Sequence, residues 1–571
     1  MSTQQDFRQQ PPPPLPARHL QLPSATEARL SNGLAVVIVE DRRLPLVSYR
    51  LSFRTGDAHD PPELPGLTEM LTGLLTEGTE SLSSREIADE IARMGATLSA
   101  GANSDYSTVA ASSLSRFGDQ VLELLADVTL RPSFPENEVA LARQNTKESL
   151  RQQRAQPSFL ATEMVSRCMF GQHPYSVIAP TPESLDATSR DRLIEFHRSQ
   201  FVPNNAVFII VGDVHAESVL KRIERLFGQW EPAGTVADDF PAPPAHTSRS
   251  ARIVDRPGSA QSNIVIANLG ITRMNPDYFP MLLMHTVLGA NASSRLFMNL
   301  REDKGYTYGA YSNLDARRSA GTFRASAEVR TPVTGDSLKE FFYELERIRS
   351  QPVSQKEITD AKAFLTGVFP IRLETQEGLI DQLVQIRMFG LPENYLDTYR
   401  DKVQAVTVEQ IREVAERYVK PDQATIVIVG DGIQIEEQIA PYTDDVTFFN
   451  TAGKPKSRPS LTPKNVVRAP QNIVGNWQLE IQTPLGQTIP ATLILEEAET
   501  GLTGRVESEM GDADLLTVNL DGQSLAATLA FDMGAGETVE AQISGELSGE
   551  QIQGSIILQN SPPLTFTGSK Q

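Results

Sequence analysis

The sequence predicts an α+β protein in which two homologous α/β repeats are followed by a small all-β domain, an antiparallel barrel or sandwich. Three observations predict this class. Short motifs from the first half recur in the same order more than 200 residues later, both copies mix strand-like with helix-like patterns, and from residue 471 onward only short alternating runs occur. At 571 residues, the chain is also too long for one hydrophobic core.

The internal repeat rests on three matches with nearly constant spacing. Residues 83–85 return as 293–295, residues 169–171 as 388–390 and residues 208–213 as 426–431, with offsets of 210, 219 and 218 residues. Three matches in one order do not arise by chance, and the period is far too long for a solenoid. Each copy is therefore expected to be a whole domain.

The first copy opens with strands and continues with helices. Alternation of apolar and polar side chains predicts strands at 34–40 and 47–53. From Leu67 to Leu75, leucine and methionine recur at i, i+3, i+4, i+7 and i+8, which is the spacing of one buried helix face.

Proline-rich stretches divide the chain. The run Pro11–Pro14 indicates an extended tail, while Pro241, Pro243 and Pro244 indicate a stiff exposed linker. The predicted segments are a disordered Pro-rich tail (1–24), a first repeat (25–232), a linker (233–250), a second repeat (251–450), a basic linker (451–470) and an acidic β domain (471–571).

The last segment differs in pattern and in charge. Short alternating runs separated by Gly, Asp and Asn turns predict an antiparallel meander, in which Trp477 of Gly475-Asn-Trp is expected to pack in the core. Residues 471–571 hold 14 Asp and Glu against 2 Lys and Arg, a net charge of −12 within a total of −20. Such a surface repels nucleic acid and anionic membranes. A tether, a solubilising module and a binding domain all remain open as its role.

Composition also bounds the cellular setting. No stretch reaches the length of a membrane span, and the single cysteine, Cys168, excludes an intramolecular disulfide and a cysteine-based zinc cluster. Residues 1–24 lack the apolar core of a secretory signal. A cytoplasmic location is expected for the chain as given, and a periplasmic one if a signal peptide has been removed.

Residues 66–79 read Gly-Leu-Thr-Glu-Met-Leu-Thr-Gly-Leu-Leu-Thr-Glu-Gly-Thr. With the two repeats, this segment resembles the pitrilysin or insulinase (M16) family of metallopeptidases over about residues 25–450, which implies repeats of the M16 (LuxS/MPP-like) type. In that family the segment typically reads Gly-Leu-Ala-His-Phe-Leu-Glu-His-Met-Leu-Phe-Lys-Gly-Thr. Its two His bind Zn²⁺, the Glu between them is the general base, and a later Glu completes the ligand set.

In this chain Glu69, Thr72 and Gly73 occupy the positions of His, Glu and His. The later ligand position falls at or near Glu148. Two separated carboxylates cannot supply the neutral nitrogen donors of a tight zinc site, so we expect no metal ligand and no cofactor in this chain. Two solvated helix-face glutamates are the preferred interpretation, and a weak oxygen-rich site for another cation is the alternative.

No other catalytic constellation replaces the zinc motif. The seven histidines are scattered, with no two separated by three to five positions, and His173 matches a loop of the family that is structural there. Neither a Gly-x-Ser-x-Gly elbow, a P-loop nor a Rossmann glycine set occurs. An independent hydrolase therefore has no nucleophile to support it.

The second repeat carries a different signal. Residues 294–311 match the family's second-domain signature, in which an Arg is followed seven positions later by a Tyr, here Arg301 and Tyr308. The repeat offset places the apolar Ile91 and Leu98 at these positions in the first copy. A guanidinium and a phenol can donate hydrogen bonds to a peptide carbonyl as charge develops on it. The alternative is structural, with Arg301 favoured at a helix C-terminus and Tyr308 packed in a strand.

The resemblance implies a function for this combination. Some members of the family divide catalysis between two subunits, of which one carries zinc and the other lacks it but supplies the Arg and Tyr. We expect this chain to be the non-catalytic subunit, closing the chamber of a zinc-bearing homologue and presenting Arg301 and Tyr308. The substrate would be unfolded peptide, paired with a strand edge near 99–105 or its equivalent in the other half. The alternative is a catalytically inert scaffold homologue.

Overall fold

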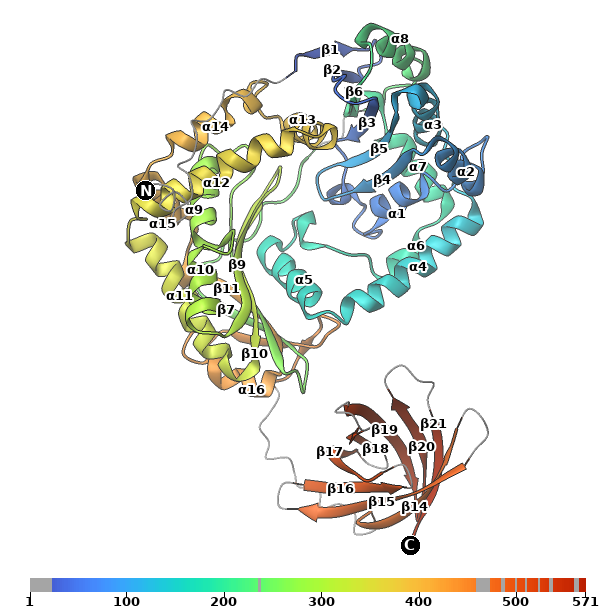
Figure 1. Cartoon of the computed structure of the whole chain (residues 1–571), viewed down its shortest axis with the longest axis vertical. Helices are drawn as coiled ribbons and strands as arrows, with labels where there is room; N and C mark the ends of the chain where they lie inside the picture. The colour runs from blue at the N-terminus through green and yellow to red at the C-terminus, as the bar shows by residue number, and fades with distance from the viewer. Residues whose placement is uncertain are drawn as a thin grey trace, which may run out of the picture. The chain divides into compact units, whose positions relative to one another are not determined.

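The computed structural model describes residues 23–234, 238–458 and 473–571, the last range with gaps at 484–487, 499–500, 509–510, 522–523, 533–537 and 559–563. Residues 1–22, which hold most of the predicted tail, and 459–472, which hold most of the second predicted linker, lie outside the described residues. The chain divides into two compact units, Met1–Pro459 and Ser460–Gln571 (Figure 1).

The first repeat is built on a six-stranded sheet in the order β1-β2-β6-β3-β5-β4. Its strands are β1 (Ala25–Arg29), β2 (Ala35–Glu40), β3 (Leu46–Phe53), β4 (Thr97–Ala102), β5 (Ser107–Leu114) and β6 (Ala206–Gly212). Strand β6 is buried along its whole length and pairs in parallel with β2. Its continuous apolar sequence reflects a strand covered on both faces. Strand β4 lies at one edge of the sheet.

The second repeat has a seven-stranded sheet in the order β13-β12-β7-β11-β8-β10-β9. Its strands are β7 (Ser250–Asp255), β8 (Gln261–Leu269), β9 (Thr307–Ala316), β10 (Gly321–Arg330), β11 (Thr425–Gly430), β12 (Val446–Phe449) and β13 (Pro455–Lys456). The order β7-β11-β8-β10-β9 repeats β2-β6-β3-β5-β4 of the first sheet. The predicted duplication of one α/β unit is thus confirmed, and β9 holds the edge position that β4 holds in the first copy.

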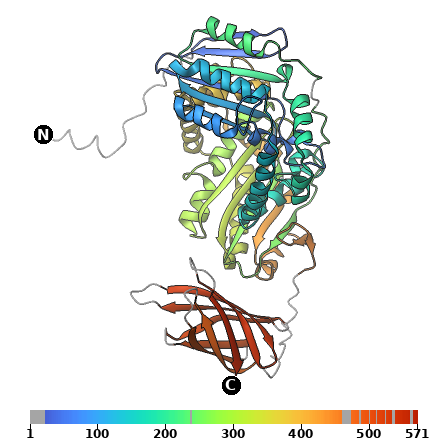
Figure 2. The same ribbon diagram turned by 90° about the vertical axis from the view of Figure 1, so that its right-hand side faces the viewer.

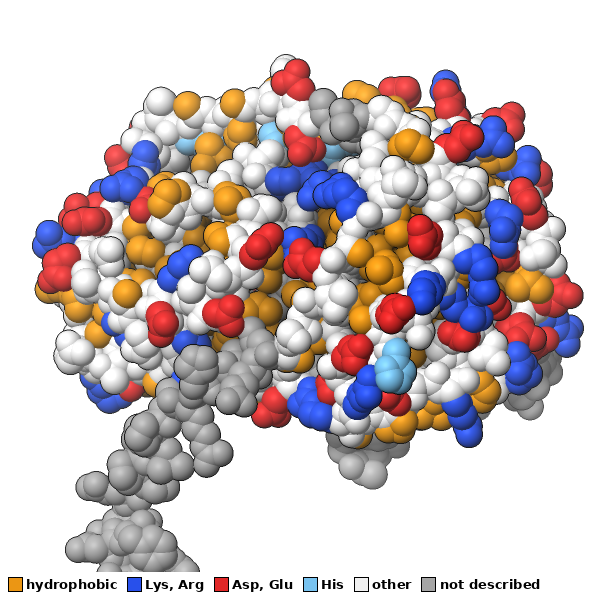
Figure 3. All heavy atoms as spheres, turned by 90° about the horizontal axis from the view of Figure 1, so that it is seen from above, with side chains coloured by type: hydrophobic (Ala, Val, Ile, Leu, Met, Phe, Trp, Pro, Cys, Tyr) orange, Lys and Arg blue, Asp and Glu red, His pale blue; other side chains and the backbone are white. Residues whose placement is uncertain are grey.

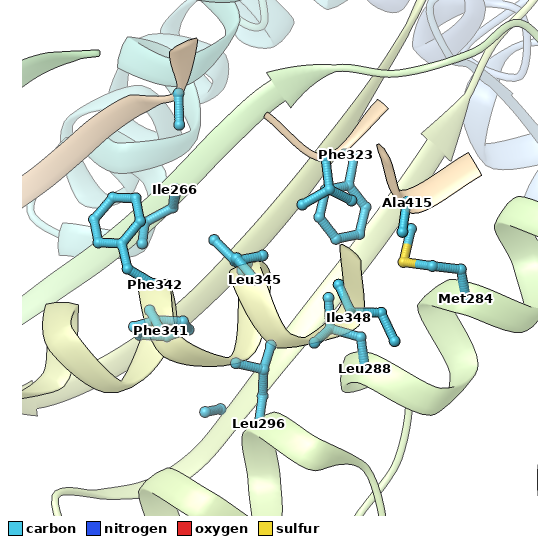
Figure 4. Packing of buried hydrophobic residues seen from close by; sticks show 14 of the residues in the cluster. Ile266, Met284, Leu288, Leu296, Phe323, Phe341, Phe342, Leu345, Ile348 and Ala415 are labelled. Carbon is cyan, nitrogen blue, oxygen red and sulfur yellow. The ribbon is translucent and has the colours of Figure 1, made fainter. Parts of the chain in front are cut away.

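Most helices of each repeat cover one face of its own sheet, and one helix of each, α5 and α13, does not. The first copy has α1 (Leu67–Leu74), α2 (Ser84–Met94), α3 (Gly118–Leu130), α4 (Glu136–Arg154), α5 (Pro157–Phe170), α6 (Pro182–Ala187), α7 (Arg190–Gln200) and α8 (Ala216–Phe227). The second has α9 (Tyr278–Gly289), α10 (Arg295–Phe297), the π-helix η6 (Met298–Asp303), α11 (Thr334–Ser350), α12 (Gln355–Leu373), α13 (Gln376–Phe389), α14 (Tyr395–Ala405), α15 (Val408–Tyr418) and α16 (Gly432–Ile439). Figure 4 shows Phe341 and Leu345 of α11 in the second core with Ile266 and Phe323 of the sheet.

The two repeats exchange one helix each. Helix α13 packs Leu379 and Ile380 onto the second face of the first sheet, against Val37 and Ile209. In the same way, α5 of the first repeat covers the second face of the other sheet, where Met164 and Val165 meet Val265 and Val427. Because each sheet depends on a helix from the other repeat, the two repeats form one cooperative core.

This exchange predicts how residues 23–458 unfold. Ile380 is fully buried between α13 and the first sheet, so Ile380→Ala should lower the free energy of unfolding by about 2–5 kcal/mol. Urea denaturation followed separately by intrinsic fluorescence and by far-UV circular dichroism should give one shifted transition. The matched control is Ile371→Ala, because that isoleucine of α12 is 63% exposed. An equal loss in both variants would contradict the assigned packing.

Polar contacts join the repeats where β9 turns into β10. Arg317 Nη1 donates to Ser104 Oγ at 3.0 Å, and His173 Nε2 lies 2.9 Å from Ser319 Oγ. The hydroxyl of Tyr175 bonds to the buried carboxylate of Asp105. The loops that follow β4 and β9 therefore meet, and His173 contributes a hydrogen bond to this contact between the repeats.

Both predicted linkers contribute more structure than expected. In the first, Phe240 packs its ring 5.4 Å from that of His59 and 5.4 Å from that of His173, so this part of the predicted exposed linker is anchored to the first repeat. In the second, Pro455–Lys456 forms β13 against β12, and Lys456 pairs with the buried Asp255. An aromatic ring and an ion pair provide the anchoring that proline content alone does not reveal.

The C-terminal unit is a closed antiparallel barrel, which decides between the barrel and the sandwich left open by the sequence (Figure 2). Its strands are β14 (Gly475–Gln482), β15 (Thr488–Ala498), β16 (Gly501–Ser508), β17 (Ala513–Asp521), β18 (Ser524–Asp532), β19 (Thr538–Ser548), β20 (Gln551–Leu558) and β21 (Leu564–Lys570). Trp477 is fully buried in the barrel core, and its Nε1 donates to Ile473 O at 2.8 Å. The ring thus packs as predicted.

The surface in Figure 3 carries interspersed acidic and basic side chains, with apolar side chains visible in the hollow between them. No single basic area covers this face, as a nucleic-acid footprint would require. Among the described helices, none combines the length and the hydropathy that a membrane span requires.

Candidate functional site

Helix α1 is fixed by a carboxylate from outside the helix. Gly66, at φ +91°, starts the helix without a side chain to cap it. Asp60 supplies the cap instead, because its carboxylate accepts hydrogen bonds from Gly66 N at 2.7 Å and Thr68 N at 2.9 Å. Leu67 and Leu71 then bury one face in the first core. The opposite face, which carries Glu69 and Gly73, is turned toward a cavity.

That cavity has a volume of about 500 Å³ and lies between α1, α4 and the edge strand β4. Glu69, Thr72 and Gly73 all line it, so the three positions of the degenerate zinc motif face one cavity. Thr72 Oγ1 donates to Thr68 O and Glu69 O at 3.0 Å each, which leaves it tied to the helix backbone. At Gly73 an added Cβ would meet no atom within 4 Å. The cavity has room for imidazoles that the sequence does not provide.

Glu148, at or near which the resemblance places the later ligand position, does not line this cavity. Its carboxylate is 57% exposed and pairs with Arg151 at 3.1 Å. From the corresponding turns of α4, the cavity is lined instead by Asn145 and Thr146. Across the part of the chain that is described, no group of three or more His, Cys, Asp or Glu could hold a metal ion.

Two carboxyl groups near Glu69, those of Asp57 and Asp60, have raised pKa values. Burial, followed by the charges of Asp60 and Glu69, raises the pKa of Asp57 to about 7. Burial also raises the pKa of Asp60 to about 6, although its hydrogen bonds to Thr68 and Gly66 oppose this. Asp57 Oδ1 is buried without a hydrogen-bond partner among the described residues. The N-terminal end of α1 therefore holds closely spaced acids that do not ionise easily.

A pH dependence follows with a definite sign. Because the pKa of Asp57 is about 7 in the folded chain, the folded state keeps a proton that the unfolded state loses near pH 4. This contribution to stability is present below pH 4 and is lost as the pH rises toward 7. Since one pKa unit is equivalent to about 1.4 kcal/mol, the rise to about 7 implies that Asp57→Asn should raise the free energy of unfolding by up to about 4 kcal/mol at pH 8.5 and leave it nearly unchanged at pH 4. Urea denaturation at both pH values measures this, with Glu148→Gln as control; a gain at pH 4 of the same size would contradict the assignment.

Arg301 lies on the π-helix η6, which buried polar contacts hold in place. Arg295 pairs with Glu357 at 2.6 Å, and Asn299 Nδ2 donates to Glu344 at 3.0 Å. The guanidinium of Arg301 lies 4.7 Å above the ring of Phe297 and is half-exposed, and its one ion pair among the described residues is a long 3.5 Å contact with its neighbour Glu302. Single-turn π-helices often mark functional positions. Arg301 is thus anchored at its base and accessible at its charged end.

Tyr308 lies near the start of β9, on the outer edge of the second sheet, where the register with β10 shifts between Ala327 and Val329. Its side chain is 91% exposed, the highest value among the large apolar and aromatic side chains on the described surface. Within the described part of the chain, its hydroxyl makes no hydrogen bond. The interpretation that Tyr308 packs in a strand is therefore wrong, because its ring contributes to no core.

The first copy differs at both equivalent positions. Ile91 of α2 and Leu98 of β4 are partly buried and pack against the first hydrophobic core. The asymmetry inferred from the repeat offset is thus seen in the packing as well. One copy has apolar contacts where the other presents an exposed cation and an exposed phenol.

Comparison with known proteins agrees with this geometry. Residues 35–182 match the profile described as insulinase (peptidase family M16), and residues 187–365 match the profile described as the peptidase M16 inactive domain. The chain belongs to the M16 family. It differs from the zinc-binding members in carrying Glu69, Thr72 and Gly73 in place of the zinc motif.

Several M16 homologues are similar over most of their length. A Bacillus subtilis protein named uncharacterized zinc protease YmxG is 24% identical over 70% of this chain and 97% of its own. A Helicobacter pylori protein named non-peptidase homolog YmxG is 23% identical over 72% of this chain and 95% of its own. A crystal structure of a peptidase M16 inactive domain from Pseudomonas fluorescens superposes with a TM-score of 0.67 at 26% identity, over 72% of this chain and 98% of that one. Each alignment thus leaves more than a quarter of this M16 chain unmatched.

Proposed function

We propose that this chain is the non-catalytic subunit of a two-subunit M16 zinc peptidase. It pairs with a homologue that carries an intact His-x-x-Glu-His motif, closes the chamber around the substrate, and presents Arg301 and Tyr308 to a peptide bound at the partner's metal. Zinc, the attacking water and the general base belong to the partner. The repeats at 25–232 and 251–450 form the chamber wall, and the segment from 471 to 571 is an accessory domain.

The observation that carries the proposal is the exposure of Tyr308. A tyrosine ring that is 91% exposed loses the stabilisation that burial would give, so its position needs a reason other than folding. The helix η6, which carries Arg301, packs against the edge strand β9, which carries Tyr308, and neither side chain is engaged by a strong partner among the described residues. A cation and a phenolic donor on these neighbouring elements suit a substrate carbonyl that gains negative charge during attack.

The cavity beside α1 supports the absence of catalysis in this chain. Glu69 is an oxygen donor, Thr72 Oγ1 is bonded to backbone carbonyls, and Gly73 offers no ligand. The cavity is also lined by Glu77, Glu138, Asn145 and Thr146, so it has none of the imidazole donors of the family's zinc motif.

Edge strands β4 and β9 supply the peptide-binding surface of the proposal. Ala100, Gly101 and Ala102 of β4 line the cavity, and small side chains leave the backbone of an edge strand open to pairing. Strand β9 presents its free edge beside Tyr308. An unfolded peptide adding to either edge would gain main-chain hydrogen bonds independent of its sequence.

A second candidate is a catalytically inert scaffold, which the name of the Helicobacter pylori homologue, non-peptidase homolog, favours. A scaffold also needs no zinc motif. It gives no reason, however, for a half-exposed, weakly paired guanidinium and a nearly fully exposed phenol on neighbouring elements. Both candidates predict a partner, but only the first predicts that the partner's activity depends on this chain.

Reconstitution separates the two candidates. We would purify this chain and the M16 homologue of the same genome that carries His-x-x-Glu-His, and follow a quenched-fluorescence peptide with each protein alone and with the mixture. Cleavage that requires both proteins, is inhibited by a chelator and coincides with co-elution on size exclusion is the expected result. An active partner whose rate is unchanged by this chain would favour the scaffold. Chelator-sensitive cleavage by this chain alone would refute the proposal.

A further inference from the structure

A separate pocket lies on the second repeat, at the N-terminal end of α9. It has a volume of about 360 Å³ and is formed by the loop before α9, the first turn of α9, and helix α14. Its wall includes the aromatic rings of Tyr278, Phe279 and Tyr395 together with the cations of Arg273 and Lys402. The volume falls in the range of small-molecule sites. Neither Arg301 nor Tyr308 lines it.

Arg273 is a buried cation without a carboxylate. It is 7% exposed, its guanidinium carbon lies 3.8 Å from the centre of the Tyr278 ring, and its Nη2 donates to Tyr395 Oη at 2.6 Å. In the described part of the chain, no Asp or Glu oxygen lies within 4.0 Å of its nitrogens. Burial of an unpaired charge is costly, so ordinary structural arginines pair with an acid.

Neighbouring groups do not balance this charge. Burial raises the pKa of Tyr395 to about 12, so the phenol that accepts from Arg273 stays neutral at physiological pH. Asp277, at the start of α9, is engaged by Arg417 and by the Tyr418 hydroxyl at 2.8 Å. Lys402 adds a second positive charge, with Nζ 5.7 Å from the centre of the Phe279 ring. The pocket is therefore lined by two cations and no carboxylate.

We infer that this pocket binds a carboxylate attached to a hydrophobic body, either a free organic acid or the C-terminus of a peptide. One face of the Arg273 guanidinium is stacked on Tyr278, which leaves its planar edge for the paired hydrogen bonds that a carboxylate accepts. The rings of Phe279 and Tyr395 provide apolar walls for the rest of the ligand. Lys402, at the mouth, attracts the anion without fixing its orientation.

Calorimetric titration of the full chain with matched pairs of ligands tests this inference. N-acetyl-phenylalanine is compared with its amide, and a short peptide ending in phenylalanine with its C-terminal amide. We expect saturable binding of the acids and at least about tenfold weaker binding of the amides, because each amide loses the charge-assisted pair. Binding of both acids assigns the site to carboxylates in general, and binding of the peptide acid alone assigns it to peptide C-termini. Equal affinity for acid and amide would overturn the inference.

Variants locate the binding in the pocket. Arg273→Gln should weaken the acids at least about tenfold and leave the amides unchanged, while Lys356→Gln, which removes an exposed lysine of α12, should change nothing. If Arg273→Gln unfolds the chain, Ala405→Trp fills the pocket from an exposed position and keeps Arg273 in place. Undiminished acid binding in a folded Arg273→Gln or Ala405→Trp variant would show that the ligand binds elsewhere.

Discussion

Arg301→Ala is expected to lower kcat for peptide cleavage by the reconstituted complex about 100-fold or more, with KM changed much less. The expectation follows from the proposed role, because a donor that acts on developing negative charge stabilises the transition state more than the bound substrate. Removing one such donor typically costs on the order of 2.7–4 kcal/mol. Tyr308→Phe, which removes only the hydroxyl, should act in the same direction. Initial rates over a range of peptide concentrations separate kcat from KM.

The matched controls come from the same repeat. Tyr343→Phe removes a phenol from α11 that is 53% exposed, and Arg349→Ala removes a partly exposed guanidinium that pairs with Glu346. Neither should change the rate. If Arg301→Ala and Tyr308→Phe left a partner-dependent rate unaltered, the pair would have no role in turnover, although the subunit itself could still be required.

The second large effect is the creation of a zinc site in the cavity beside α1. Glu69 and Gly73 are one helical turn apart and both line the cavity, and Asn145 faces it from α4. The triple variant Glu69→His, Gly73→His, Asn145→Glu should therefore bind one zinc ion with a dissociation constant below about 1 µM, equivalent to about 8 kcal/mol. Competition with a fluorescent chelator measures the affinity, and the unaltered chain should retain no stoichiometric zinc.

The third ligand position provides an internal control. A variant with Glu69→His and Gly73→His but with Asn145 unchanged should bind zinc more weakly, because it lacks the added carboxylate and because Glu148 is exposed and pairs with Arg151. Equal affinity of the double and triple variants would show that Asn145 does not face the metal position. Tight zinc binding by the unaltered chain would contradict the description of this cavity altogether.

Sequence patterns alone predicted the repeat and the positions at which its two copies differ in chemistry. The offset between 83–85 and 293–295 aligns Ile91 with Arg301, and in the structure Ile91 packs against the first hydrophobic core. The exchange of α5 and α13 was not predictable in this way. Apolar residues such as Leu379 and Ile380 show that a helix face is buried, but periodicity does not say which sheet covers it.

Glu148 illustrates a similar limit at the site. Successive helix residues point about 100° apart, so spacing along α4 does not by itself say which side chains face the cavity. Asn145 and Thr146 face the cavity, while Glu148 faces solvent. The raised pKa of Asp57 and the unpaired charge of Arg273 depend on neighbours distant in the sequence. The spacing of residues in the sequence therefore predicted neither the raised pKa nor the unpaired charge.

The exchange of α5 and α13 between the two repeats bears on how such a chain could have arisen. A single copy would leave one apolar sheet face exposed to water, a surface prone to aggregation unless a second copy covered it. The simplest ancestor with this packing is a homodimer that swapped these helices, later joined by gene fusion. With both copies in one chain, the repeats can differ at single positions, as Ile91 and Leu98 differ from Arg301 and Tyr308, while α5 and α13 still cover both sheets.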